Sequence, residues 1–476
     1  MDLPGTPLLI GFYTEGLPFD GATIYEQGLG GSESALFFMA RELAKLGHRV
    51  QVFCHTWRPG VYEGVEYHNL AIFPQAAAAQ VFDVFIVSRF PQVFAQPFNS
   101  RLKVMWNHDN LVEPGKYRRE TFRADLFFTL SAYHEAEYLS QLPELAPFCR
   151  RTKNGVDLEL ARQAREGVTK DMTKVVYVSR PERGLEILLR QIWPRLLRAW
   201  PELHLDLMGY QAPDKPGQEH LKALVAAAPR TMVLGSLDKP EYYRHLAQAA
   251  LLLYPCSFPE ISCIAALEAQ ALGTPIITSR DFALVETVGV PDYLIPGRPA
   301  FPEYQESFAN RALDYLEDAH RYRQDTAAAL KWVSEHYSWD RIAREWLEVF
   351  AHHAALNPEA KDLSYTLFLG DGGGIGPSWP TPPPAEMRYL NLPESRLDLA
   401  ALKPRLEAEA QGEWLLLLED ASLSGALPPL QPLLDASSVD WFGFRREPQP
   451  PGHWDGVLFR RHCPLTADNG LEVVIP

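Results

Sequence analysis

The stretch that most constrains the fold lies between residues 249 and 278. An apolar run, Ala249–Tyr254, has the length of a buried strand. A turn-prone stretch with two prolines follows, and then a helical stretch, Ser262–Leu272. Gly273 suits the helix C-terminus, and the next apolar run, Pro275–Thr278, begins another strand. This strand–loop–helix–strand unit is the repeating piece of a parallel α/β sheet.

Two carboxylates stand out in this unit. Glu260 lies in the loop before the helix, and Glu268 lies inside an otherwise apolar helical stretch, where burial is costly without a partner. A helix N-terminus at the carboxyl end of a strand binds anions, and Glu268 lies roughly 9 Å further along the axis. A nucleotide sugar could therefore meet Glu260, the helix N-terminus and Glu268 together. From spacing alone, the simpler interpretation is that both glutamates face solvent on an amphipathic helix.

Composition limits the class of protein. With 476 residues the chain is too long for one compact domain, so two or three are expected. A net charge of −15 argues against nucleic acid as the main partner. Five scattered cysteines without metal-ligand spacing indicate a reducing compartment and no metal site. The N-terminus does not resemble a signal peptide, and no apolar run approaches the roughly 18–20 residues of a membrane span, so we expect a cytoplasmic protein.

The N-terminal half repeats the α/β pattern. Pro7–Tyr13 reads as a strand, Thr14–Gly31 as a glycine-rich turn and Ser32–Leu46 as a helix, which is the arrangement that brings a backbone close to a phosphate. Further strands are predicted at Val50–Cys54, Val81–Ser88, Lys103–Asn107 and Asp125–Ser131. His108 follows the carboxyl end of a predicted strand, where α/β domains bind ligands, although a surface histidine in a loop fits equally well.

The C-terminal half begins with a strand, Lys174–Ser179, and a helix that starts at Leu185. Arg180 and Arg183 lie between them, where two guanidinium groups suit a diphosphate. The alternative is a pair of surface arginines near Glu182. Later elements are predicted as strands at His204–Gly209 and Thr231–Leu234 and as a helix at Glu241–Ala250.

Several of these motifs together resemble the retaining family 4 glycosyltransferases, which have the GT-B fold. The resemblance rests on Glu260 and Glu268 with the A-x-A-x-G-x-P segment after them, on Gly30-Gly31-Ser32-Glu33 and on Asn154-Gly155-Val156-Asp157. It covers about residues 5–355 and implies two Rossmann-like parallel-sheet domains that face a cleft. Residues 1–165 would form the acceptor side and 166–355 the nucleotide-sugar side, with the segment Glu335–Phe350 as a last helix that crosses back.

The resemblance also implies an activity, the transfer of a sugar, in this case a hexose, from a nucleoside diphosphate sugar to an acceptor with retained anomeric configuration. The acceptor would be a glycan, a lipid-linked or protein acceptor, or a small molecule. Neither a metal nor a cofactor besides the nucleotide sugar is implied. A phosphorylase or hydrolase on the same fold, and an idle nucleotide-sugar-binding scaffold, are the alternatives.

The residues implied for this site are His108 and Glu260 as catalytic residues and, for the donor, Gly30, Gly31, Arg180, Arg183, Ser262, Cys263, Ile264 and Glu268. Two positions depart from the family pattern, because Ile261 stands where glycine is usual and Arg183 where lysine is usual. A basic stretch, Arg118, Arg119 and Arg123, is either a solvated face or a contact for an anionic acceptor or a peripheral membrane surface.

Residues 356–476 differ from the rest and are predicted as a small α/β appendage for acceptor binding or assembly. A glycine run at 372–376 lacks the Lys-Ser/Thr pair and the helix of a phosphate loop, so we interpret it as a linker. Strands are predicted at Tyr365–Gly370 and Trp414–Leu418, with a helix at Leu397–Ala410 between them. The second strand, followed by Glu419 and Asp420, faintly resembles the central strand of GT-A glycosyltransferases and their acidic metal-binding triplet.

Overall fold

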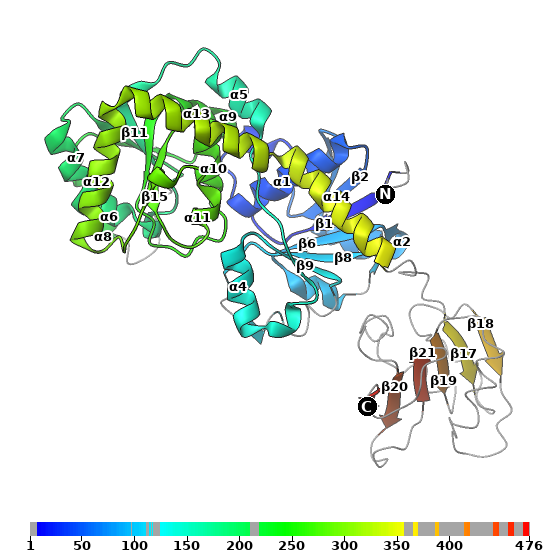
Figure 1. Cartoon of the computed structure of the whole chain (residues 1–476). Helices are drawn as coiled ribbons and strands as arrows, with labels where there is room; N and C mark the ends of the chain where they lie inside the picture. The colour runs from blue at the N-terminus through cyan, green and yellow to red at the C-terminus, as the bar shows by residue number, and fades with distance from the viewer. Residues whose placement is uncertain are drawn as a thin grey trace. The chain divides into compact units, whose positions relative to one another are not determined.

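The computed structural model describes residues 7–96, 98–110, 114–115, 117, 124–209 and 219–356, and six strands between residues 365 and 475. The chain forms two compact units, one of residues 1–93 with 102–352 and one of residues 94–101 with 353–476. Figure 1 shows the helices and strands under the labels that we use below.

The first unit contains two sheets, and the N-terminal one has the strand order β10-β9-β8-β6-β1-β2-β4-β3. All its neighbouring strands are parallel except β3 and β4. Its strands are β1 Leu9–Tyr13, β2 Arg49–Cys54, β3 Gly60–Tyr62, β4 Val65–Asn69, β6 Val84–Ser88, β8 Lys103–Trp106, β9 Leu126–Thr129 and β10 Cys149–Arg151. The helices that accompany it are α1 Gly31–Lys45, α2 Phe73–Ala79 and α4 Ala132–Gln141. Strands β1, β2, β6, β8 and β9 are almost fully buried, as expected where helices cover a parallel sheet, whereas β3 and β10 at its two edges are largely exposed.

The second sheet is entirely parallel, with the order β13-β12-β11-β14-β15-β16. Its strands are β11 Asp171–Val178, β12 His204–Met208, β13 Thr231–Gly235, β14 Ala249–Tyr254, β15 Ile276–Ser279 and β16 Leu294–Ile295. Its helices are α5 Leu158–Arg165, α6 Leu185–Ile187, α7 Trp193–Ala199, α8 Glu219–Ala227, α9 Lys239–Gln248, α10 Ile264–Ala271, α11 Leu284–Thr287, α12 Pro302–Glu317 and α13 Ala319–His336. A π-helical turn, Leu188–Ile192, joins α6 to α7.

The last helix of this unit, α14 (Trp339–Leu356), contributes to the hydrophobic core of the N-terminal sheet through Trp346 and Phe350. Figure 1 shows α14 passing over the strands of that sheet. The prediction of one helix over Glu335–Phe350 is wrong, because α13 ends at His336 and α14 begins at Trp339. The Tyr337 carbonyl accepts the Val156 N–H at 2.8 Å, and the Ser338 hydroxyl accepts the Arg341 N–H at 3.2 Å, so a new helix starts there.

The predicted strand Val81–Ser88 is also interrupted, into β5 (Val81–Phe82) and β6. Asp83 lies at the break, where its carboxylate accepts the Leu9 N–H at 2.8 Å. The predicted helix Glu241–Ala250 ends two residues earlier, since Ala249 begins β14. Helix α10 begins at Ile264 and not at Ser262.

The C-terminal part contains a third sheet with the order β18-β17-β19-β21-β20-β22. Its strands are β17 Tyr365–Leu369, β18 Glu386–Tyr389, β19 Trp414–Leu418, β20 Trp441–Arg446, β21 Gly456–Arg460 and β22 Gly470–Ile475. Strands β17, β18 and β19 are parallel, and β21 is antiparallel to β19 and β20. Three predicted features lie outside the described residues, namely the helix Leu397–Ala410, the glycine run at 372–376 and the acids Glu419 and Asp420. The faint resemblance to GT-A glycosyltransferases, which depends on these two acids, therefore stays a prediction. None of the described helices has the length and apolar character needed to span a bilayer.

Candidate active site

The N-termini of helices α1 and α10 lie close together. A Cβ atom on Gly31, the first residue of α1, would lie 3.7 Å from the Ile264 Cδ1, which belongs to the first residue of α10. Among the described residues, neither N-cap residue, Gly30 of α1 or Cys263 of α10, makes a side-chain capping hydrogen bond, whereas Ser131, Asp157 and Asp238 cap α4, α5 and α9. Backbone N–H groups in the first turn of a helix attract anions, so an uncapped pair of N-termini is suited to a negatively charged ligand.

Ser262 and Cys263 lead into α10, and Cys263 is its N-cap residue. The Ser262 hydroxyl oxygen is buried and has no hydrogen-bond partner among the described residues. A buried hydroxyl without a partner costs free energy, which an oxygen atom of a ligand would recover. Burial raises the pKa of the Cys263 thiol well above its ordinary value, so this side chain is a neutral thiol.

Glu260 is buried, with only 4% of its surface exposed. Its Oε1 accepts hydrogen bonds from Arg183 Nη1 at 2.8 Å and from the Tyr254 hydroxyl at 2.5 Å. The Arg183 guanidinium also lies 4.1 Å from the centre of the Phe258 ring. Glu260 and Arg183, two residues predicted for the site, are therefore brought together after the ends of β14 and β11 as an ion pair between a buried carboxylate and a partly exposed guanidinium.

Glu268 is 3% exposed, so the interpretation that both glutamates face solvent is wrong. Its Oε1 accepts hydrogen bonds from Lys239 Nζ at 2.8 Å and from the Tyr243 hydroxyl at 3.1 Å. Lys239 and Tyr243 both belong to α9, which follows the carboxyl end of β13. The apolar surroundings of Glu268 in the sequence predict that it needs a partner, but they identify neither Lys239 nor Tyr243.

His108 follows β8, with its ring 4.4 Å from that of Trp106. Its Nε2 atom is buried and lacks a hydrogen-bond partner in the described structure. Burial, together with the positive charge of Arg89 and the proximity of His134, lowers the pKa of His108 to about 3. The imidazole is therefore neutral at physiological pH and can exchange a hydrogen bond with a ligand through Nε2.

The glycine-rich turn encloses the carboxylate of Glu33. A Cβ atom on Gly30 would lie 2.3 Å from Glu33 Oε2, so only glycine allows this approach. Arg89, a residue not predicted for the site, connects the turn to the loop after His108. Its guanidinium bonds the Ser32 hydroxyl at 3.2 Å and the Asp109 carboxylate at 3.0 Å. Arg89 adopts a φ of 72°, a left-handed conformation that is unfavourable for a residue with a side chain.

Direct contacts join the loops of the two sheets. Asn110 Nδ2 donates to the Pro259 carbonyl at 2.9 Å, which ties the loop of His108 to that of Glu260. Ile261 belongs to the hydrophobic core of the N-terminal sheet, although it is carried by the loop after β14. The residue that departs from the family pattern therefore packs between the two sheets, and it does so with a negative φ that needs no glycine.

Arg180 is exposed after β11. The basic residues Arg118, Arg119 and Arg123 lie outside the described residues. Within the described ranges, no three His, Cys, Asp or Glu side chains are arranged to hold a metal ion.

Comparisons with known proteins agree with this architecture. A family model described as "Glycosyl transferases group 1" matches residues 173–318. The lipopolysaccharide 1,2-N-acetylglucosaminetransferase of Salmonella typhimurium is 25% identical over 231 residues, which cover 46% of this chain and 59% of that protein. The chain thus spans about three-fifths of the length of this relative.

Among solved structures, Anabaena HepE in complex with UDP and glucose is similar with a TM-score of 0.53 and 18% identity, over 72% of this chain and 99% of that one. The sucrose-phosphate synthase of Thermosynechococcus elongatus is similar with a TM-score of 0.55 and 20% identity, over 73% of this chain and 100% of that one. At these identities the likeness concerns the fold, and it confirms the predicted GT-B fold with two Rossmann-like domains.

Proposed function

We propose that the protein is a glycosyltransferase that moves a hexose from a nucleoside diphosphate sugar to an acceptor with retention of configuration. The observation that carries the proposal is the pair of neighbouring N-termini of α1 and α10, whose N-cap residues provide no side-chain cap, with the unpartnered Ser262 hydroxyl beside them. A diphosphate bound there would accept backbone N–H bonds near Gly30, Gly31, Cys263 and Ile264. Arg180 and Arg183 would neutralise the charge that develops as the diphosphate leaves.

The two glutamates would hold the ends of the donor. Both hydrogen bonds to Glu260 end on Oε1, and so do both bonds to Glu268, which leaves Oε2 of each carboxylate as the oxygen offered to a ligand. Glu268 would bind the ribose hydroxyls and Glu260 the sugar hydroxyls, while His108 Nε2 would bond the reacting sugar or the acceptor. No side chain serves as a covalent nucleophile in this scheme, and the arginines and helix N-termini supply the positive charge without a metal.

For the rest of the reaction we propose a sugar-containing acceptor and a cytoplasmic site of action. The Salmonella relative, whose name specifies lipopolysaccharide and N-acetylglucosamine, supports a glycan acceptor. Retention is tested by following the anomeric proton of the product by NMR during the first turnovers. A product of inverted configuration, or release of a free sugar phosphate, contradicts the proposed reaction.

Donor binding is tested by calorimetry with UDP, GDP and ADP and their hexose conjugates, for the wild type, Arg180→Ala and Glu268→Ala. Loss of a charge-assisted hydrogen bond is worth about 1.5–3 kcal/mol, so each variant should bind its nucleotide about tenfold to a hundredfold more weakly. Arg198→Ala, which removes an exposed arginine from α7, is the matched control. Unchanged nucleotide affinity in Arg180→Ala and Glu268→Ala would contradict the assignment of these two residues to the donor site.

A further inference from the structure

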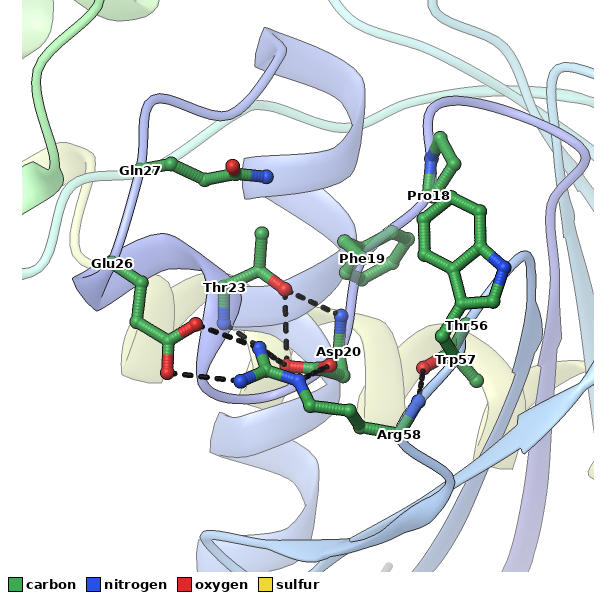
Figure 2. A pocket seen from close by; sticks show the side chains of 9 residues that line it. All are labelled: Pro18, Phe19, Asp20, Thr23, Glu26, Gln27, Thr56, Trp57 and Arg58. Atoms are coloured by element: carbon green, nitrogen blue, oxygen red, sulfur yellow. Dashed lines mark hydrogen bonds and ion pairs between the residues drawn. The ribbon is translucent and has the colours of Figure 1, made fainter.

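We propose that a pocket beside the glycine-rich turn binds a neutral sugar ring of the acceptor, with Trp57 as the surface on which the ring stacks. This inference rests on the proposed glycosyltransferase function. The pocket has a volume of about 220 Å³ and lies after the carboxyl ends of β1 and β2. Figure 2 shows the side chains that line it, among them Asp20, Gln27, Trp57 and Arg58.

Trp57 is the main reason to expect a sugar. Its side chain is 82% exposed, although transfer of so large an apolar surface out of water is favourable by several kcal/mol in general. Within the described part of the chain the indole neither stacks on another ring nor forms a hydrogen bond. The C–H face of a pyranose is flat and apolar, and it matches the area of an indole while its hydroxyls stay available for polar groups.

The polar side of the pocket is already fixed in position. Arg58 donates to Asp20 at 2.8 Å and 3.0 Å and to Glu26 at 2.8 Å and 3.0 Å, and the Thr56 hydroxyl accepts the Arg58 N–H at 3.1 Å. Figure 2 shows the Arg58 guanidinium between the two carboxylates. Planar, hydrogen-bonding groups held in one geometry favour recognition of hydroxyls, because little conformational freedom is lost on binding.

The charge of the pocket selects a neutral ring. Asp20 and Glu26 face the single cation Arg58, so one negative charge remains uncompensated within the lining. Phosphorylated or carboxylated sugars would be repelled by this charge. The amide of Gln27 is a neutral donor and acceptor at the same rim, which suits hydroxyl or acetamido groups.

The pocket also lies on the same edge of the fold as the donor site. Gln27 is followed by Gly28, and a Cβ atom on Gly28 would lie 1.9 Å from the Ser236 hydroxyl, in the loop before α9. Helix α9 carries Lys239, the partner of Glu268. The turn that carries Gln27 continues through Gly28 and Gly30 into the N-terminus of α1, so the pocket adjoins the proposed diphosphate site on the side of the N-terminal sheet, to which the acceptor is assigned.

The test uses saturation-transfer NMR on the full chain with methyl glycosides of glucose, galactose, mannose and N-acetylglucosamine as probes, and a hexose phosphate as the anionic comparison. At least one neutral glycoside should bind the wild type, and Trp57→Ala should weaken it about tenfold. Trp57→Phe, which keeps a smaller ring, should lose less glycoside affinity than Trp57→Ala. Gln27→Ala should shift the preference among the glycosides. Phe301→Ala removes an exposed ring from the start of α12 and should change nothing.

The same samples are titrated with the nucleotides, which separates the two proposals. Nucleotide binding without any glycoside signal, or equal glycoside binding by the wild type and Trp57→Ala, overturns the acceptor pocket and leaves the proposed function intact. Tighter binding of the hexose phosphate than of its neutral glycoside overturns the charge argument and the choice of ligand. If the chain binds a glycoside at Trp57 but binds no nucleotide, the result contradicts the proposed glycosyltransferase function and leaves the sugar pocket intact.

Discussion

Individual residues of the candidate site are held in place before any ligand arrives. Glu260 and Glu268 share one arrangement, in which Oε1 accepts from a cation and from a tyrosine hydroxyl. A buried carboxylate is costly to desolvate, and a single cation with a good hydrogen bond offsets that cost. The consequence is a carboxylate of fixed direction, which is what a site for precisely placed hydroxyls requires.

The Lys239–Glu268 pair permits a direct test of this arrangement. Lys239→Ala should lower the free energy of unfolding by about 3–5 kcal/mol, because it leaves a buried carboxylate unpaired. The double variant Lys239→Ala/Glu268→Ala should lose less stability than the sum of the losses in the two single variants, as measured by urea denaturation. The exposed pair Lys331–Glu335, 3.9 Å apart, is the control and should couple by less than about 1 kcal/mol. Additive losses at Lys239 and Glu268 would contradict a coupled buried pair.

His108 gives a prediction about pH. Its pKa is lowered to about 3 in the folded chain, so the unfolded chain binds a proton more readily below pH 6.5. The stability that the neutral imidazole contributes is complete above pH 6.5 and is lost as the pH falls toward 3, at up to about 1.4 kcal/mol per pH unit. His134, whose pKa burial lowers to about 4, acts in the same direction.

The measurement is the stability of the wild type and His108→Gln between pH 8 and pH 4, with the ring protons of His108 followed by NMR. The variant should show the shallower acid dependence, and the His108 signals should not titrate between pH 5 and pH 8. An ordinary titration near pH 6.5 would show that the ring takes up a proton in the folded chain as readily as in water, and would contradict the lowered pKa of His108.

The spacing of Glu260 and Glu268 and the position of His108 after a strand can be read from the sequence, since all three follow local patterns. The residues that form hydrogen bonds with the site cannot be read from the sequence. Lys239 lies 29 residues from Glu268, and Arg89 lies 57 residues from Ser32, so only the folded sheet edges bring them together. For the same reason the sequence alone favoured solvent-facing glutamates, because burial is decided by partners that spacing does not reveal.

At the level of helices and strands, the two sheets meet through helix ends. The Glu286 carboxylate, in α11, accepts the N–H groups of Ala132 at 2.9 Å and Tyr133 at 3.3 Å, which open α4 on the N-terminal sheet. A carboxylate at a helix N-terminus satisfies free N–H groups and interacts favourably with the helix dipole. Helix α4 is thereby capped twice, by its own Ser131 and by a residue of the other sheet.

Replacing Glu286 with Ala should therefore loosen this contact without unfolding either sheet. The loss of a cap costs about 1 kcal/mol, so amide exchange at Ala132 and Tyr133 should accelerate several-fold. Hydrogen exchange followed by mass spectrometry or NMR measures this effect. Glu303→Ala, an exposed glutamate in the first turn of α12, should leave these amides unchanged. Equal exchange in Glu286→Ala and the wild type would show that the contact does not persist in solution.

Element positions were predictable where one apolar run forms one strand, as for Ala249–Tyr254, which is β14 without a shift. They were not predictable where long-range hydrogen bonds interrupt a favourable run. Asp83 breaks an apolar stretch because its carboxylate binds the backbone of β1, and Tyr337 ends α13 because its carbonyl binds the segment before α5. In both cases the competing partner is more than 70 residues away, at a separation of 74 for Asp83.

At the scale of the whole molecule, the first unit is joined by hydrophobic residues that pack into the core of the N-terminal sheet from later parts of the chain. The core of the N-terminal sheet includes Ile261, from the loop after β14, and Trp346, from α14, besides its own strands. Arg41 of α1 also binds Asp157, between the two sheets, at 2.7 Å. The alternation of strands and helices predicted two parallel sheets, but it does not specify that Ile261 and α14 complete the core of the N-terminal sheet, because this depends on packing between segments that are distant in sequence.

This packing predicts a large effect at Trp346, a residue distant in sequence from the core that it completes. The Trp346 ring lies 4.7 Å from that of Trp106, and its Nε1 donates to the Thr152 hydroxyl at 2.5 Å. Trp346→Ala should lower the free energy of unfolding by about 3–5 kcal/mol, since a fully buried ring leaves a cavity. Trp346→Phe should recover part of the loss by restoring the ring, but not the hydrogen bond to Thr152. Trp57→Ala, which removes an exposed ring, should change stability by less than about 0.5 kcal/mol. Denaturant unfolding followed by circular dichroism measures all three, and a Trp346→Ala variant as stable as Trp57→Ala would show that α14 is not part of the N-terminal core.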